Sequence, residues 1–139
     1  MSMKADELTS KDLMVGDWLM HSNGTLMQVK RIVFGHFACG EKYTNFWEYN
    51  NKFQPIPLTS EILEENNFQK DPDYIDTYWR PDCSKFCFVK ECDDWYFAIR
   101  YKGGHICIKE CNYVHKLQHI LIDLLDIDAE VVVRKYKTL

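Results

Sequence analysis

The chain has 139 residues, which is the length of one ordinary domain. Hydrophobic residues make up 46% of it and charged residues 27%, values close to the averages of globular proteins, so a wholly disordered chain is excluded. The formal net charge of −4 argues against a protein that coats nucleic acid generally.

The first residues lack the apolar core of a signal peptide, and no apolar stretch reaches the roughly 18 residues that cross a bilayer. We therefore expect a cytoplasmic protein that makes no membrane contact. In that compartment its six cysteines are expected to stay reduced.

The N-terminal half is predicted to consist of short β-hairpins. A strand over residues 13–20 and a return strand over 25–34 flank Asn23-Gly24, a dipeptide that favours a two-residue hairpin turn. Shorter strands are expected at 37–39 and 45–49.

A short helix is predicted after residues 55–58, whose two prolines keep this segment extended. Thr59 is a suitable N-cap because its hydroxyl can accept a hydrogen bond from a free N–H group of the first turn. Asn67 is expected to end the helix in the left-handed conformation, with Phe68 folding back. Residues 69–84 have no periodic pattern, so we expect a long functional loop or a short decorated excursion there.

A three-stranded antiparallel meander is predicted over residues 85–109, where aromatic and aliphatic side chains alternate with others. Its aromatic and aliphatic face is expected to be buried, and it would carry Phe86, Phe88, Trp95, Phe97, Ile99, Tyr101, Ile106 and Ile108. Asn112 is expected to cap a helix whose apolar stripe, from Val114 to Leu125, packs on that face. A last strand is expected at 130–136.

These elements define an α+β fold: an N-terminal half rich in β-hairpins, a short helix, and a β-β-β-α-β unit whose helix packs on an antiparallel meander. We expect residues 1–139 to form a single domain. The alternative is an N-terminal β subdomain of residues 12–58 and a C-terminal α/β subdomain of residues 59–139.

Four cysteines form two C-x₃-C pairs, Cys83 with Cys87 and Cys107 with Cys111, at a spacing that zinc sites also use. Cys87 and Cys107 fall on the outer strands of the predicted meander, with Ala98 between them. Two strand spacings are about 9.5 Å, which is too far for a disulfide and awkward for one metal ion. We therefore interpret these residues as buried reduced thiols, and we expect no metal and no cofactor.

Cys111, His115 and His119 follow one another at intervals of four residues. On one continuous helix they would share a face, and His at i and i+4 is a metal-ligand spacing. The reading that we favour is the exposed polar face of an amphipathic helix. An enzyme that pairs His115 with Cys111 is also left open, but the sequence supplies no positioned base or oxyanion site, so no catalytic residue is assigned.

Aromatic residues gather in two predicted loops. Trp47 lies in the first, and Tyr78, Trp79 and Arg80 lie in the second. Trp, Tyr and Arg are enriched at binding hot spots, although such rings can equally fill the gaps of an irregular core.

Four motifs stand out along the chain: Val15-Gly16-Asp17-Trp18, Pro55-Ile56-Pro57-Leu58-Thr59, Trp95-Tyr96-Phe97 and Tyr113-Val114-His115-Lys116-Leu117-Gln118. In these motifs and their order the chain resembles a family of small uncharacterised proteins from phages and mobile elements of gut Bacteroidetes. The resemblance implies an origin in the cytoplasm of a bacterial host and no particular reaction. It also makes His115 a site candidate, because His115 matches the family pattern, whereas Cys111 does not belong to it and family members commonly have Asn in place of His119.

We therefore predict a non-catalytic accessory protein of a phage or mobile element that binds a protein partner, as a monomer or a homodimer. The candidate binding residues are Trp47, Tyr78, Trp79, Arg80 and His115. One alternative is a nucleic-acid-binding accessory protein that uses the N-terminal β half and the basic edge at 134–135. The other is a Cys/His-dependent enzyme or a metal-binding protein.

Overall fold

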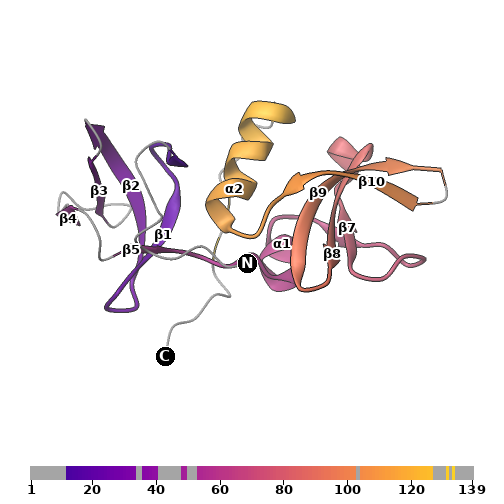
Figure 1. The fold of residues 1–139 in the computed structure, drawn as a ribbon, viewed down its shortest axis with the longest axis horizontal. Coiled ribbons are helices and arrows are strands. Elements are labelled where there is room, and N and C mark those ends of the chain that lie inside the picture. The colour runs from indigo at the N-terminus through magenta and orange to yellow at the C-terminus, as the bar shows by residue number, and fades with distance from the viewer. Residues whose placement is uncertain are drawn as a thin grey trace. The chain divides into compact units, whose positions relative to one another are not determined.

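Two compact units make up the computed structural model, and each is built on its own antiparallel sheet of five strands (Figure 1). The structure describes residues 12–33, 36–40, 48–49, 53–102, 104–126, 131 and 133. Within these ranges, the first unit contains the residues up to Pro57 and Tyr113–Ile120, and the second contains Leu58–Asn112 and the residues from Leu121 onward. The fold is α+β with β-structure dominant. No helix in the described part of the chain is long and apolar enough to cross a membrane.

The sheet of the first unit has the strand order β4-β3-β2-β1-β5. Its strands are β1 (Trp18–His21), β2 (Leu26–Val33), β3 (His36–Gly40), β4 (Glu48–Tyr49) and β5 (Phe53–Pro55). The predicted hairpin of β1 and β2 is confirmed, but the two-residue turn centred on Asn23-Gly24 is wrong. The N–H of Gly24, whose φ is 93°, donates to the carbonyl of His21 at 2.9 Å, so Ser22 and Asn23 are the central residues of the turn and only Gly24 takes the positive φ. The core of this unit is a cluster of buried side chains from Leu13, Leu19, Met27, Val29, Phe37, Cys39 and Phe53.

The helix α2 (Val114–His119) belongs to the first unit and continues into a π-helical turn, η4 (Ile120–Leu124). The residues of η4 from Leu121 onward fall in the second unit, which also contains the meander. Within the first unit the buried side chain of Gln118 accepts the N–H of Trp18 and donates to the carbonyl of Gly16, near the start of β1. The packing of this helix on the meander stays a prediction.

The prediction that Asn112 caps α2 is wrong. Tyr113 is the N-cap, and it makes no side-chain capping bond. Asn112 is occupied elsewhere, because its Oδ1 accepts the backbone N–H of Trp95 at 2.7 Å and its Nδ2 donates to Asp94 at 3.2 Å. The apolar stripe is correct for Leu117, which is fully buried, but its far end at Leu124 is exposed.

The sheet of the second unit has the strand order β10-β9-β8-β7-β6. Its strands are β6 (Gln69–Lys70), β7 (Thr77–Trp79), β8 (Phe86–Glu91), β9 (Asp94–Tyr101) and β10 (Gly104–Glu110). The helix α1 (Ser60–Glu65) precedes them and is capped as predicted, with Thr59 Oγ1 accepting the N–H of Ile62 at 3.2 Å. The predicted end of the helix is confirmed as well: Asn67 has a φ of 71°, and the N–H of Phe68 donates to the carbonyl of Leu63 at 3.0 Å.

The expectation of a long loop over residues 69–84 is wrong. This segment supplies β6, β7 and a 3₁₀ turn, η3 (Pro81–Cys83). Strands of two and three residues are too short to produce an alternating pattern, and they exist because β8 offers a partner edge to β7.

The meander is present with the predicted register, since Cys87 and Cys107 both lie opposite Ala98. Trp95 and Phe97 are buried as predicted. The predicted burial is wrong for Ile99, Tyr101, Ile106 and Ile108, which are exposed because they lie on the edge strand β10 or opposite it on β9. The predicted strand at 130–136 lies mainly outside the described residues, and neither Val131 nor Val133 within it is in a strand.

Candidate functional site

The aromatic residues that were predicted to bind a partner make contacts within the second unit. Tyr78 is buried on β7, with its ring centroid 5.8 Å from that of Trp95. Trp79 is half-buried, and the guanidinium of Arg100 lies 4.5 Å from its ring centroid. Trp47 lies outside the described residues. The contacts of the two described rings match the alternative of a filled core.

The side chain of Arg80 forms hydrogen bonds to a residue two positions along the chain. Its Nε and Nη2 donate to the two carboxylate oxygens of Asp82 at 2.9 and 2.6 Å, and its guanidinium lies 5.5 Å from the ring centroid of Phe68. The hydrogen bonds from Arg80 lower the pKa of Asp82. A role of Arg80 in binding a partner stays a prediction.

His115 is completely buried in the first unit, so the expected exposure of this helix face is wrong. Its ring is stacked against Tyr113, with centroids 5.9 Å apart, and meets the ring of His119 edge-on at 5.8 Å. Neither ring nitrogen has a hydrogen-bond partner in the part of the chain that the structure describes. Burial lowers the pKa of His115 to about 3, so the ring is neutral at pH 7.

His119, which is partly buried, forms a pair with the buried carboxylate of Asp17. Its Nε2 lies 2.6 Å from Oδ2 of Asp17, and this oxygen also accepts the backbone N–H of Met14 at 2.8 Å. The proposed grouping of Cys111, His115 and His119 on one helix face does not form, because Cys111 precedes the first residue of α2.

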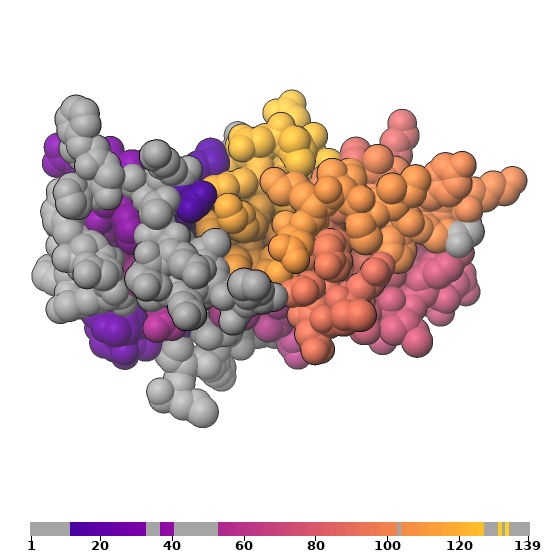
Figure 2. Space-filling view, in the orientation of Figure 1, coloured from indigo at the N-terminus to yellow at the C-terminus, as the bar shows by residue number. Residues whose placement is uncertain are grey.

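The β9–β10 surface carries exposed apolar side chains at the edge of the second sheet. It consists of Ile99, Tyr101, Ile106 and Ile108, whose exposed fractions are 39, 65, 52 and 47%. Ile99 lies directly opposite Ile106 across the two strands, so their side chains are neighbours on one face. Atoms of this hairpin, in orange, are uncovered in Figure 2.

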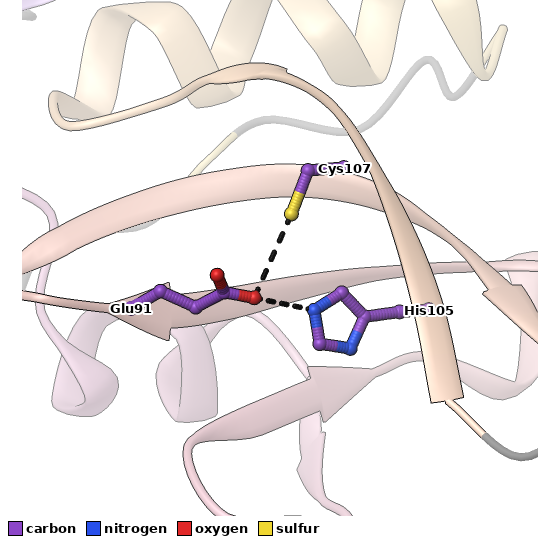
Figure 3. A group of neighbouring side chains, drawn as sticks. All are labelled: Glu91, His105 and Cys107. Carbon is purple, nitrogen blue, oxygen red and sulfur yellow. Dashed lines mark hydrogen bonds and ion pairs between the residues drawn. The ribbon is translucent and has the colours of Figure 1, made fainter.

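A second feature of the same hairpin is a cluster of three ionisable side chains, Glu91, His105 and Cys107 (Figure 3). Nε2 of His105 lies 2.5 Å from Oε2 of Glu91, and Sγ of Cys107 lies 3.7 Å from the same oxygen. One possible ligand atom from each side chain falls within 4.8 Å of the others. Among the described residues this is the one group of three or more His, Cys, Asp or Glu side chains that meets this limit.

The sheet positions these three residues on one face. Glu91 ends β8, and its partner on β9 is Asp94, whereas His105 and Cys107 lie on β10 opposite Arg100 and Ala98. Directly paired residues share a face, and so do residues two apart on a strand. The register of β9 and β10 shifts after Cys107, and such an irregularity bends a strand. The bend of β9 and β10 is visible in Figure 1.

The local electrostatics keep the thiol of Cys107 protonated. Partial burial and the negative charge of Glu91 raise the pKa of the Cys107 thiol, which donates a hydrogen bond to Glu91. Burial also raises the pKa of Cys87, on the same face, to about 11. At pH 7 both groups are therefore thiols.

The predicted burial of the paired cysteines is correct for Cys87 and Cys111 but wrong for Cys107, which is exposed, and Cys83 is only partly buried. Glu91 and His105 were not predicted as site residues. A usable signal was present, because His105 and Cys107 are two residues apart on a predicted strand and must share a face. No comparable sequence signal brings Glu91 close to His105 and Cys107, because this contact depends on the register and the bend of the sheet.

Comparisons of the chain with protein-family models, with curated proteins and with solved structures find no match. Inference about function therefore depends on the side chains themselves.

Proposed function

We propose that this chain is a non-catalytic protein-binding module, an accessory protein of a phage or mobile element, and that its protein partner docks on the β9–β10 surface. The observation that carries the proposal is the exposure of four large apolar side chains on two adjacent strands. Water contact with adjoining apolar groups is unfavourable, and a patch of this kind is typical of an interaction site.

The position of β10 adds a second attraction. In the described part of the chain β10 pairs with β9 and is an edge strand of its sheet. The outer edge of such a strand presents backbone N–H and C=O groups that a strand of a partner can bind. Backbone hydrogen bonds would supply affinity, and the side chains of Ile106 and Ile108 would supply apolar contact.

Origin in a phage or mobile element rests on the resemblance of the four motifs. Nucleic-acid binding rests on basic residues, of which Arg31 is exposed on β2 while the basic edge at 134–135 lies outside the described residues. Salt-dependent retention on heparin would favour that alternative over a protein partner.

The test compares the unmodified chain with the double variant Ile106→Lys/Ile108→Lys. Ile122→Lys is the matched control, because Ile122 is also exposed at 47% but lies outside the β9–β10 surface. Each tagged protein is used to capture partners from the bacterial host, and its own oligomeric state is measured by light scattering.

We expect one protein, or a second copy of this chain, to associate with the unmodified chain and the control but not with the double variant. Equal association of all three proteins would overturn the assignment of the surface. Failure of the unmodified chain to associate with any protein, together with salt-dependent binding to heparin, would replace the proposed function by the alternative.

A further inference from the structure

We propose that Glu91, His105 and Cys107 form a Zn²⁺ site on the second sheet. This inference goes beyond partner binding and does not rest on it. The three side chains supply a carboxylate oxygen, an imidazole nitrogen and a thiolate sulfur, which are the ligand types that Zn²⁺ uses in proteins. Mg²⁺ and Ca²⁺ prefer oxygen ligands alone, so this set of donors selects against them.

The separations of the donor atoms are close to those of a tetrahedral zinc site. With a Zn–S bond of about 2.3 Å and a Zn–O bond of about 2.0 Å, sulfur and oxygen lie about 3.5 Å apart at the tetrahedral angle. The distance from Cys107 Sγ to Glu91 Oε2 is 3.7 Å. The sulfur and the carboxylate therefore already stand at ligand spacing.

The imidazole and the carboxylate must separate slightly. Nitrogen and oxygen ligands of one tetrahedral zinc lie about 3.3 Å apart, whereas Nε2 of His105 and Oε2 of Glu91 are 2.5 Å apart. The required movement is under about 1 Å, and the Glu91 side chain is 47% exposed, so it has room to turn.

The hydrogen bonds of the cluster also point to one ion position. The thiol of Cys107 donates to Oε2 of Glu91, and the contact between His105 and Glu91 converges on the same oxygen. The sulfur of Cys107 and the imidazole nitrogen of His105 therefore both face one carboxylate oxygen. Zn²⁺ binding would displace the thiol proton of Cys107, because the thiolate is the form that binds the metal.

The strand fixes two of the three ligands in advance. His105 and Cys107 are two residues apart on β10, so they share a face. Backbone pairing holds them opposite Arg100 and Ala98. Ligands carried by a strand lose less freedom on binding than ligands on a loop. Three protein ligands leave the fourth tetrahedral position to water.

The experiment uses the full chain, reduced, freed of metal with a chelator and desalted. Co²⁺ is added first, because a thiolate ligand gives it an intense charge-transfer absorption in the near ultraviolet. Zn²⁺ is then titrated into fresh protein by calorimetry. The variants are Cys107→Ser, His105→Gln and Glu91→Gln. Cys92→Ser is the matched control, since Cys92 is an exposed thiol in the turn between β8 and β9.

We expect the unmodified chain to bind one Zn²⁺ and to show the thiolate–Co²⁺ band, and the control to do the same. Cys107→Ser should abolish the band. His105→Gln and Glu91→Gln should each weaken Zn²⁺ binding by roughly tenfold or more, because even the loss of a group that only supports a ligand costs about that much. The proposal is overturned if the unmodified chain gives no thiolate band, if the band survives Cys107→Ser, or if Cys92→Ser abolishes it.

A measurement on the unmodified chain covers the case in which Cys107→Ser does not fold. Alkylation of each cysteine is followed by peptide mass spectrometry with and without Zn²⁺. Slower alkylation of Cys107 in the presence of Zn²⁺, with Cys92 unaffected, supports the site. An unchanged rate at Cys107 overturns it.

Discussion

The side-chain carbonyl of Gln118 accepts the backbone N–H of Trp18 at 2.8 Å, and so joins two residues that are 100 positions apart. The amide nitrogen of the same side chain donates to the carbonyl of Gly16 at 3.0 Å. Gln118 is buried, so water cannot easily replace either bond. The first unit is therefore completed by a segment that follows the entire span of residues 58–112.

Replacement of Gln118 by Met tests this relationship. Methionine has a similar length but makes neither hydrogen bond, and it leaves the N–H of Trp18 without its acceptor. We expect the free energy of unfolding to fall by about 2 kcal/mol in urea denaturation. Lys116→Met is the control, because the side chain of Lys116 takes part in neither hydrogen bond. It should change the free energy of unfolding by less than about 0.5 kcal/mol. Equal effects of the two substitutions would contradict the role of Gln118.

Asn112 offers a test that separates the observed contact from the predicted helix cap. Its Oδ1 accepts the N–H of Trp95 at 2.7 Å. Serine is a good N-cap residue, but its shorter side chain does not reach Trp95. We therefore expect Asn112→Ser to lower the free energy of unfolding by about 1–3 kcal/mol, as much as Asn112→Ala. If Asn112→Ser were as stable as the unmodified chain while Asn112→Ala was not, the side chain would be acting as a cap after all.

The features that could be predicted from the sequence are those decided within a few residues. The turn at Gly24 needs only a residue that tolerates positive φ. The cap at Thr59 joins atoms three residues apart. The register that places Cys87 and Cys107 opposite Ala98 follows from two short turns and the alternation of the strands.

The features that could not be predicted depend on contacts between distant parts of the chain. Polar residues on α2 suggested an exposed face, yet Gln118 is buried because the backbone of β1 supplies its partners. A buried polar residue with distant partners has the same sequence pattern as a surface residue. The cluster around Glu91 was missed for the related reason that its members, 14 and 16 residues apart, meet only through the bend of the sheet.

At Asn67, which ends α1, substitution by alanine and by glycine should have opposite effects on stability. Asn67 has a φ of 71°, in the left-handed region, where a side chain with a Cβ is strained and glycine is not. Asn67→Ala should lower the free energy of unfolding by about 1 kcal/mol, whereas Asn67→Gly should be neutral or slightly stabilising. Chemical denaturation of the pair measures the difference directly. Equal stability of the two variants would show that the backbone at this position is not held in the left-handed conformation.

His115 predicts a specific loss of stability in acid. Its pKa is lowered from an ordinary value of 6.5 to about 3, mainly by burial and to a smaller extent by Lys116 and His119, while Asp12 opposes the shift. Between these two pH values the unfolded chain binds a proton that the folded chain excludes. The free energy of unfolding therefore falls as the pH drops below 6.5, by about 1.4 kcal/mol per pH unit from this residue, until the pH approaches 3.

Leucine at this position removes both the proton site and two buried nitrogens that have no partner among the described residues. We expect His115→Leu to be more stable than the unmodified chain at pH 7 by about 1–3 kcal/mol, and to lose less stability between pH 6.5 and 4.5. Leu117→Val is the control, because Leu117 is fully buried on the same helix and carries no ionisable group, so its substitution should change the stability by the same amount at each pH. Urea denaturation at several pH values measures all three slopes. If His115→Leu lost stability in acid as steeply as the unmodified chain, the proton that destabilises the fold would have to bind elsewhere.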